Sequence, residues 1–261
     1  MVGKKGKVIV IYSPKGGTGR TTIATNLAIA FQSAEKTCLV DGSLQFGDVA
    51  VFLNEQGKNT ILDLAPRVDE LDPDIVQEVM VSHATSGLHI LAAPPRPEYS
   101  EEVDGEQFSK LLQYLRQIYA YIVVDTTSYL TETVQSALDI ADLIILLTTQ
   151  DIPAIKSINL FLGISDATGI NRKRILFVMN RYDKRIAITP EKVGESLRQE
   201  ISLAIPLEER IVPVSINKGV PFIIEQKASP IARSIFSLAD LCRQRLDQLA
   251  ATEIDSPPKK K

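Results

Sequence analysis

Residues Ser13 to Thr22 read SPKGGTGRTT and bring glycines, two cations and several hydroxyls together in one short stretch. Such a stretch is typical of a phosphate-binding loop, whose usual pattern is G-x-x-x-x-G-K-[ST]. Two positions depart from that pattern, because Pro14 stands where its first glycine belongs and Arg20 stands where its lysine belongs. A second cation, Lys15, lies where the usual pattern asks for no particular residue. The stretch therefore predicts a phosphate site of an unusual kind.

The types of residue in this loop suit an anion that carries a metal ion. Its glycines allow successive backbone N–H groups to turn toward one anion: Gly16, Gly17 and Gly19. The helix that we predict directly after them points its N-terminal dipole at the same place. Arg20 adds a positive charge, Thr21 offers a hydroxyl where a phosphate-bound Mg²⁺ needs one, and Thr22 offers a second hydroxyl. We therefore expect a nucleotide with Mg²⁺ here and not an ordinary glycine turn.

Two acidic residues end strand-like runs elsewhere in the chain. Asp41 ends the run TCLVD, and Asp125 ends the run YIVVD. In a parallel sheet the ligand lies beyond the carboxyl ends of the strands, which is also where the loop after the first strand lies. We therefore expect both carboxylates to face the phosphate loop near the metal ion.

The elements that must position these residues alternate along the chain. Short, nearly continuous apolar runs predict strands that are covered on both faces: Lys7–Ser13, Thr37–Asp41, Leu88–Ala93, Tyr121–Asp125, Leu143–Thr148 and Ile175–Asn180. Helical spacing of apolar residues marks segments between them: Thr21–Gln32, Phe108–Ile118 and Ile155–Ile164. The alternation predicts an α/β fold, a mostly parallel doubly wound sheet with helices on both faces.

Composition and length favour one ordinary globular domain. The chain has 261 residues, 44% of them apolar, with a formal net charge of −3 that gives no overall footprint for nucleic acid. We predict a single domain over residues 1–250 and a disordered tail over residues 251–261. Cys38 and Cys242 lie in separate apolar runs, which predicts buried free thiols, a reducing compartment and a cytoplasmic location.

The stretch KGGTGRTT resembles the deviant Walker A loop of the MinD/ParA family of P-loop ATPases, whose pattern is K-G-G-x-G-K-[ST]-[ST]. The resemblance covers the chain from about Lys7 to Leu249. Within that family, VDGSLQFGDVAVFLN at Val40–Asn54 looks like the branch of CpaE and TadZ proteins in Tad-type pilus assembly. The resemblance implies the MinD/ParA-like P-loop fold, with ATP and Mg²⁺ as cofactors.

The resemblance also implies a role for each matching residue. Lys15 reaches the partner's nucleotide in an ATP-sandwiched homodimer, Thr21 binds Mg²⁺, and Asp125 holds the metal through water. The nucleotide-binding residues are then Lys15, Gly16, Gly17, Thr18, Gly19, Arg20, Thr21, Thr22, Asp41, Asp125, Asn180, Pro213 and Ser215. Of these, Asn180 contacts adenine, and the backbone near Pro213 and Ser215, in a late loop at Val212–Phe222, lines the base.

Two departures from the family pattern bear on catalysis. Arg20 keeps the charge of the Walker lysine but is longer and planar, so the exchange is not neutral at a tight phosphate site. Ser43 replaces the second acid of the family's D-x-D string, which helps to position the attacking water, and Asp48 is the only acid nearby that offers a replacement. With Lys15 and Asp48 as the catalytic residues, we expect nucleotide binding with slow hydrolysis.

The function that the resemblance implies is an ATP-dependent homodimer that acts as a positioning scaffold in Tad-type pilus assembly or secretion. Its partners would then be pilus or secretion assembly proteins, and we expect no nucleic acid. We expect only indirect or weak membrane contact, with recruitment to the inner face of the membrane or a cell pole. The alternative is a faster MinD/ParA-type ATPase that positions DNA, flagella or the division machinery.

Rival interpretations rest on smaller features of the sequence. Gly17-x-Gly19-x-x-Thr22 half matches a dinucleotide fingerprint, but its third glycine is missing. The string NRYD at Asn180–Asp183 resembles the guanine reader N-K-x-D and would favour GTP.

Two further rivals concern surfaces. A basic cluster would suit a DNA-binding partition protein, although such clusters are usually solvated: Arg172, Lys173, Arg174, Arg181, Lys184 and Arg185. An apolar stripe near the C-terminus would suit a membrane-surface helix, but we expect it to pack on the core: Ile231, Ile235, Leu238, Leu241, Leu246 and Leu249.

Overall fold

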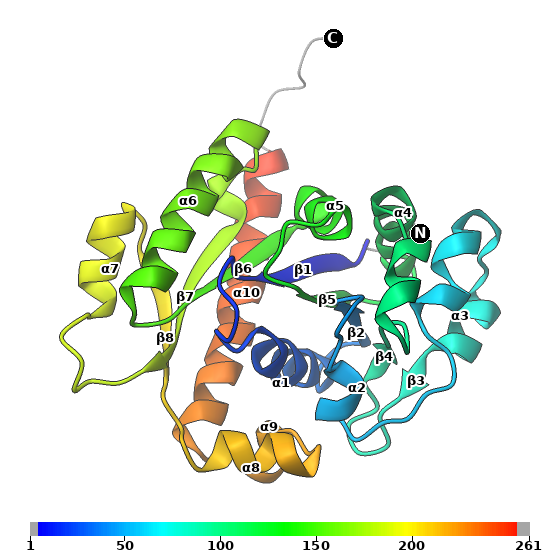
Figure 1. The fold of residues 1–261 in the computed structure, drawn as a ribbon, viewed down its shortest axis with the longest axis horizontal. Helices are drawn as coiled ribbons and strands as arrows, with labels where there is room; N and C mark the ends of the chain where they lie inside the picture. The colour runs from blue at the N-terminus through cyan, green and yellow to red at the C-terminus, as the bar shows by residue number, and fades with distance from the viewer. Residues whose placement is uncertain (1–4, 255–261) are drawn as a thin grey trace.

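The computed structural model describes residues 5–254, and its centre is an eight-stranded sheet with the strand order β3-β4-β2-β5-β1-β6-β7-β8 (Figure 1). The strands are β1 (Lys7–Tyr12), β2 (Thr37–Gly42), β3 (Val81–Ser82), β4 (His89–Leu91), β5 (Tyr121–Thr126), β6 (Leu143–Thr148), β7 (Ile175–Tyr182) and β8 (Ile201–Pro206). Every neighbouring pair is parallel except β3 and β4. The predicted α/β fold with a mostly parallel sheet is therefore confirmed.

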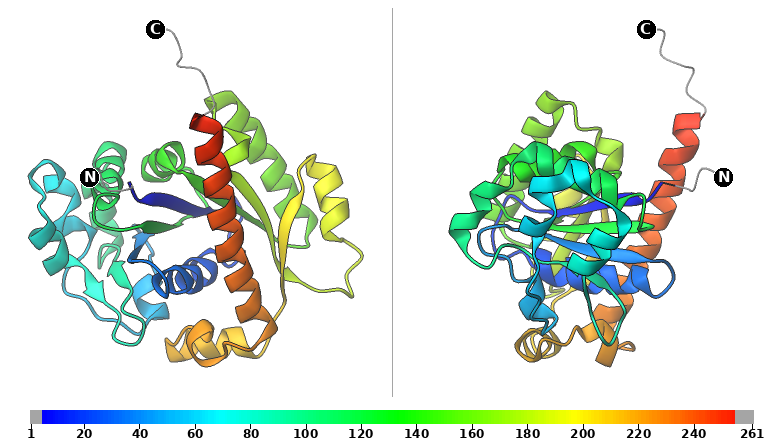
Figure 2. Two further views of the ribbon diagram at one scale, coloured as in Figure 1. Left: turned by 180° about the vertical axis from the view of Figure 1, so that it is seen from behind. Right: turned by 90° about the vertical axis from the view of Figure 1, so that its right-hand side faces the viewer.

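Helices cover both faces of this sheet. They are α1 (Arg20–Gln32), α2 (Val49–Phe52), α3 (Pro73–Val79), α4 (Gly105–Leu115), α5 (Glu132–Ile140), α6 (Ile152–Thr168), α7 (Pro190–Leu197), α8 (Ile211–Lys218), α9 (Phe222–Glu225) and α10 (Pro230–Ile254). Side chains alternate along β1, so that Val8 and Val10 pack with α4 to α6 while Ile9 and Ile11 pack with α1 and α10. Two buried cores result, one on each face of the sheet (Figures 1 and 2).

The six predicted strand runs all form strands, with ends that shift by up to two residues. The sequence analysis missed β3 and β8 because they lie at the two edges of the sheet. Edge strands are covered less completely, so the β8 sequence ISLAIP is only half-buried over most of its length and lacks the long apolar run used to find the others.

Helix α10 crosses one face of the sheet and lies behind it in Figure 1 and in front of it in the left view of Figure 2. Ile235 and Leu238 on this helix are fully buried in the core, which confirms that the apolar stripe packs within the domain. The helix continues to Ile254, so residues 251–254 are helical and the predicted start of a disordered tail at residue 251 is wrong. Residues 255–261 of that tail lie outside the described residues.

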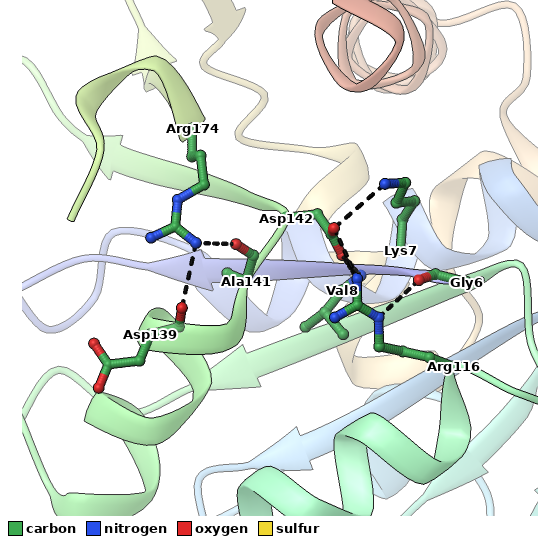
Figure 3. A network of polar contacts seen from close by, with 8 residues as sticks. All are labelled: Gly6, Lys7, Val8, Arg116, Asp139, Ala141, Asp142 and Arg174. Carbon is green, nitrogen blue, oxygen red and sulfur yellow. Dashed lines mark hydrogen bonds and ion pairs between the residues drawn. The ribbon is translucent and has the colours of Figure 1, made fainter. Parts of the chain in front are cut away.

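A polar network ties the chain together at the amino ends of the strands, on the edge opposite the phosphate loop (Figure 3). Asp142 precedes β6 and accepts hydrogen bonds from the backbone N–H of Val8 at 2.8 Å and from Nη2 of Arg116 at 2.6 Å. Arg116 at the end of α4 also donates through Nε to the carbonyl of Gly6 at 2.8 Å. Because these groups bind one another, this edge serves the fold, and the candidate chemistry lies at the other edge.

Candidate nucleotide-binding site

The phosphate loop joins the end of β1 to the start of α1, as predicted. Gly17 and Gly19 have φ values of 77° and 92°, in the left-handed region that glycine adopts without steric cost. A Cβ at residue 19 would also collide with the side-chain amide of Asn180. Gly19 is therefore required both by the backbone turn and by the close approach of β7.

The N-terminus of α1 is open toward the loop. Several other helices are capped by the side chain of the residue before them, which accepts a hydrogen bond from the first turn: Asp72 before α3, Asp104 before α4 and Thr131 before α5. Helix α1 instead begins after Gly19, has no side-chain cap and carries no acidic residue in its first turn. Its N–H groups and dipole therefore favour an external anion, which together with the glycine loop fits a phosphate group.

Asp41 and Asp125 lie opposite each other on neighbouring strands, β2 and β5, at the edge where the loop lies. Both carboxylates are buried. Burial raises the pKa of Asp41, and the negative charge of Asp125 raises it further. Burial also raises the pKa of Asp125, although the Thr21 hydroxyl and the Arg20 guanidinium act in the opposite direction. Two buried acids that repel each other are suited to a cation between or beside them.

These residues fit a magnesium ion bound together with phosphates. The Thr21 hydroxyl donates to Oδ2 of Asp125 at 2.6 Å, so the two predicted metal residues are already in contact. Asp48 lies close enough for its charge to raise the pKa of both Asp41 and Asp125. Hydroxyl and carboxylate oxygens are the ligands that Mg²⁺ prefers, usually with water and substrate phosphates completing its shell.

Arg20 makes contacts that its place in the pattern did not predict. Its Nε donates to the carbonyl of Thr126 at 2.7 Å. Its Nη1 donates to the carbonyls of Ser13 at 3.2 Å and Lys15 at 2.9 Å. The guanidinium therefore binds backbone carbonyls of the loop and of the end of β5, in addition to any phosphate that the loop holds.

The remaining loop residues differ in exposure. Lys15 is exposed, and within residues 5–254 its side chain has no hydrogen-bond or ion-pair partner. Gly16 is exposed as well, whereas Thr18 is buried and its hydroxyl donates to the carbonyl of Lys15 at 3.4 Å. The Lys15 ammonium is thus presented to solvent at the carboxyl edge of the sheet.

A cavity of about 290 Å³ adjoins the loop on the side of β7. Its lining residues are Gly19, Thr22, Ile23, Asn180, Arg181, Pro206, Leu207, Glu208, Glu209, Val212, Pro213 and Ile231. Gly19 and Thr22 belong to both the loop and the cavity, so a phosphate chain in the loop leads directly into it. The cavity has mixed apolar and polar walls, as a nucleotide base requires.

The segment that was predicted to line the base is helical for most of its length. The expected late loop at Val212–Phe222 is wrong, because residues 211–218 form helix α8 and Phe222 begins α9. Pro213 lines the cavity from α8. Ser215 lies on the same helix, but its hydroxyl donates to the carbonyl of Val220 at 2.6 Å, and it is not among the lining residues.

Several lining residues escaped the sequence analysis. Arg181 follows Asn180 with a φ of 57°, an uncommon left-handed conformation for a residue other than glycine. Glu208 accepts hydrogen bonds from the backbone N–H groups of Arg210 and Ile211 and so stabilises the start of α8. Arg181 was noted only within the NRYD string and the basic cluster, and Glu208 belongs to no motif, because the fold alone brings both residues to the cavity.

The loop after β2 carries both Ser43 and Asp48. The Ser43 hydroxyl donates to the carbonyl of Phe46 at 3.4 Å, within its own loop. Asp48 precedes α2 and is exposed, and its carboxylate does not cap that helix. The structure therefore leaves the Asp48 carboxylate available at the edge of the sheet where Asp41 and Asp125 lie.

Two aromatic side chains flank a cleft beside this edge. Phe46 follows β2 and is 75% exposed, and Tyr129 follows β5 and is 77% exposed. Both line a cleft of about 400 Å³ between the two loops. Single exposed apolar side chains are ordinary, but exposed apolar side chains that line one cleft are typical of contact surfaces.

The basic cluster considered for DNA does not form one surface. Its members Arg172 to Arg174 precede β7, whereas Arg181 and Arg185 lie at the other end of that strand. Arg172 pairs with Asp166 at 2.6 Å. The cluster is therefore divided between two edges of the sheet and is partly neutralised.

The GTP interpretation required Asp183 to read a guanine. Asp183 instead pairs with Arg185 at 2.6 Å, and its backbone N–H donates to the Gln150 side chain at 2.6 Å. Asp183 is also absent from the lining of the base cavity. These contacts argue against the guanine reader.

Comparison with known proteins assigns the site to a family. Residues 6–168 match the family described as "AAA domain". The septum site-determining protein MinD of Thermotoga maritima is 26% identical over 243 residues, which cover 90% of this chain and 87% of that protein. The putative septum site-determining protein MinD of Guillardia theta is 28% identical over 229 residues, covering 85% and 83% of the two chains.

Solved structures agree on the fold. A ParA family ATPase from Chlorobium tepidum TLS superposes with a TM-score of 0.84 at 24% identity, covering 89% of this chain and 98% of that one. MinD of Pyrococcus horikoshii OT3, solved in complex with Mg-ADP, gives a TM-score of 0.79 at 23% identity, covering 96% and 100% of the two chains. The eight-stranded sheet and its helices are therefore those of MinD/ParA P-loop structures.

Proposed function

Because the chain belongs to the AAA domain family, within the MinD/ParA group of P-loop ATPases, we propose that it binds ATP with Mg²⁺ and dimerises around the nucleotide. The observation that carries the proposal is the contact between Thr21 and Asp125 at 2.6 Å beside an uncapped helix N-terminus and a glycine loop. When bound, Mg²⁺ would neutralise the phosphate oxygens and orient the nucleotide.

Different residues of the chain would bind the metal ion, the phosphates and the base. Thr21 and Asp125 would hold the metal, while the backbone of Gly16 to Gly19 and the Arg20 guanidinium would hold the phosphates. Pro213 and Asn180 line the cavity in which the base would lie. Each group is already in place around one continuous surface, since Gly19 belongs to both the loop and the cavity.

Dimerisation is supported by what the carboxyl edge of the sheet exposes. Lys15 presents there an ammonium that has no partner among residues 5–254, and Phe46 and Tyr129 present aromatic rings on the loops that follow the two buried acids. A second copy of the chain on this edge would bring Lys15 to the partner's phosphates and would cover the aromatic rings. ATP would promote such a pairing because its phosphates neutralise the facing cations.

The cellular role that we favour is positioning of a large structure by an ATP-dependent cycle. The relatives named as septum site-determining proteins support this MinD-type role better than the pilus scaffold. The CpaE/TadZ-like scaffold in Tad-type pilus assembly stays a second candidate, because the Val40–Asn54 stretch resembles that branch. In both cases the location would be cytoplasmic. Among the described helices, none is long and apolar enough to cross a membrane.

Hydrolysis by this protein would be slow. In phosphoryl transfer the protein mainly positions water and stabilises charge. The charge-stabilising groups Lys15 and Arg20 are present, but Ser43 cannot act as a water-positioning acid, and Asp48 is the remaining candidate. The nucleotide would then act chiefly as a switch between monomer and dimer.

Titration calorimetry with ATP, with and without Mg²⁺, tests the binding part of this proposal. The wild-type protein should bind ATP more tightly when Mg²⁺ is present. Asp125→Asn should lose that enhancement, while Asp139→Asn, a substitution on the exposed surface of α5, should retain it. Failure of the wild-type protein to bind ATP, or the same Mg²⁺ enhancement in Asp125→Asn, would contradict the proposal.

A further inference from the structure

We propose that Arg20 is a brace that holds the phosphate loop in its binding shape before any nucleotide arrives, and that an arginine is present because a lysine cannot do this. Three hydrogen bonds carry the proposal, from Nε to the Thr126 carbonyl and from Nη1 to the carbonyls of Ser13 and Lys15. For its consequence on binding, the inference rests on the proposed ATP function.

The planar shape of the guanidinium explains how one side chain reaches three carbonyls. Arginine has five N–H donors in a fixed fork, whereas lysine concentrates three donors on one atom at the end of a flexible stem. In Arg20, Nε points to β5 and Nη1 points to the loop. A lysine ammonium at residue 20 has only one donor atom, so it could replace Nη1 at the loop carbonyls or Nε at the Thr126 carbonyl, but it would not join the loop to β5.

The brace connects the loop to the strand that carries the metal acid. Thr126, which accepts the Nε bond, also donates its N–H to Oδ1 of Asp125 at 3.0 Å and its hydroxyl to the carbonyl of Ile11 at 2.6 Å. Arg20, Thr126 and Asp125 therefore form one continuous chain of contacts. The position of the loop relative to the metal site is fixed by this chain and not only by the covalent path through β1.

Hydrogen bonds from a charged donor are stronger than neutral ones, and two of the three bonds, to Thr126 and Ser13, are half-buried, whereas the bond to Lys15 is exposed. Ordering the glycines of the loop costs conformational entropy, and these hydrogen bonds offset part of that cost in the nucleotide-free protein. Within residues 5–254, Nη2 of Arg20 makes no hydrogen bond. Arg20 therefore keeps two N–H donors for a phosphate while its other donors hold the loop.

The bracing role of Arg20 and a simple phosphate-ligand role predict opposite effects of Arg20→Lys on ATP binding. Arg20→Lys restores the lysine of a standard phosphate loop, so a simple phosphate-ligand role predicts equal or better ATP binding. If Arg20 braces the loop, Arg20→Lys should loosen the loop and weaken ATP binding, because the nucleotide must then order the loop itself. The two roles are separated by what happens when no nucleotide is present.

Hydrogen exchange followed by mass spectrometry on the nucleotide-free protein tests the brace directly. In Arg20→Lys, amides in peptides that cover residues 11–24 and 124–128 should exchange about tenfold faster, the scale of one lost charge-assisted hydrogen bond. Lys15→Ala should match the wild type, because only the Lys15 carbonyl takes part in the brace. Arg233→Lys makes the same substitution at an exposed residue of α10 and serves as the control, so its amides should exchange as in the wild type.

Thermal unfolding and ATP titration on the same four proteins complete the test. Arg20→Lys should unfold at a lower temperature than the wild type without nucleotide and should bind ATP about tenfold more weakly. Unchanged exchange and unchanged unfolding temperature in Arg20→Lys would overturn the brace, whatever its ATP affinity. A wild type that does not bind ATP would contradict the proposed function. The hydrogen-exchange comparison between wild type and Arg20→Lys would still test the bracing role.

Discussion

The side-chain nitrogen Nδ2 of Asn180 donates a hydrogen bond to the backbone carbonyl of Thr18 at 2.8 Å. The contact joins β7 to the phosphate loop and fixes the orientation of the amide, because only its NH₂ group can donate to a carbonyl. The oxygen Oδ1 and the second N–H of the amide are then left for a ligand in the cavity that Asn180 lines, and Oδ1 is its acceptor.

ATP should bind more tightly than GTP by about tenfold or more. Adenine presents an amino donor at its six position, which suits Oδ1 of Asn180, whereas guanine presents an acceptor there and leaves two acceptors facing each other. Competition binding with both nucleotides measures the preference. Asn180→Ala should reduce the preference for ATP. Asp183→Asn should leave that preference unchanged, because Asp183 already forms an ion pair with Arg185. A tighter complex with GTP, or a change of preference in Asp183→Asn, would contradict this assignment.

Asp41 should make the metal-free protein less stable as the pH rises. Burial and the charge of Asp125 raise the pKa of Asp41 from 3.8 to about 8. The folded protein therefore holds a proton on Asp41 that the unfolded chain releases above about pH 4, so the free energy of unfolding falls as the pH rises from about 4 to about 8. Asp41→Asn removes this proton and should show a flatter dependence.

Thermal unfolding in the presence of a chelator, from pH 5 to pH 8, measures the difference between the two proteins. The unfolding temperature of the wild type should fall relative to that of Asp41→Asn across this range. Parallel curves would show that Asp41 is ionised in the folded protein throughout.

Turnover should be well below the roughly 10 per second of a typical enzyme, since loss of one positioned acid or base costs about 10²- to 10⁴-fold in rate. Ser43→Asp should raise the rate, because it supplies an acid where the family has one. Asp48→Ala should lower the remaining rate if Asp48 positions the water. Steady-state phosphate release from the three proteins decides the matter, and fast release by the wild type, unchanged in Asp48→Ala, would show that this loop has another role.

The exposed aromatic rings should contribute to the ATP-dependent dimer. Phe46→Ala and Tyr129→Ala should each raise the dimer dissociation constant about tenfold, because buried aromatic side chains are frequent anchors of interfaces. ATP affinity of the monomer should change little, since neither ring lines the base cavity. Leu160→Ala, which removes a side chain that is 62% exposed on α6, serves as the control. Dimers of wild-type strength in both aromatic variants would place the interface elsewhere.

Much of the site could be predicted because its signals are local. A glycine loop between a strand and a helix, and an acid at the end of an apolar run, are each visible within about ten residues of sequence. The parallel sheet then brings Thr21 to within 2.6 Å of Asp125, although 104 positions separate them in the chain. The strands that carried these signals are central and buried, which is why their apolar runs were plain.

The features that were missed depend on contacts between distant segments. The pattern identified Arg20 as a phosphate ligand, but its bond to Thr126 spans 106 positions and follows from the packing of β5 beside β1. The loop at Val212–Phe222 was expected from the family resemblance, but residues 211–218 form helix α8, in which Pro213 stands in the first turn, where proline costs little. The basic cluster looked continuous in sequence, and β7 divides it.

Lys15 gives the most direct test of the central claim, which is that ATP joins two copies of this chain at the carboxyl edge of the sheet. Its side chain is exposed and, in the part of the chain that the structure describes, unpaired, while in our proposal the loop backbone and Arg20 would bind the chain's own nucleotide. Lys15→Ala should therefore lose dimerisation more than it loses ATP binding.

The measurement is the molar mass by light scattering with ATP and Mg²⁺, alongside the ATP affinity of each protein. Wild type should give a dimer with ATP and a monomer without nucleotide, and Lys15→Ala should stay monomeric at ATP concentrations that saturate it. A wild type that stays monomeric with ATP, or a Lys15→Ala variant that dimerises as readily as the wild type, would contradict the account.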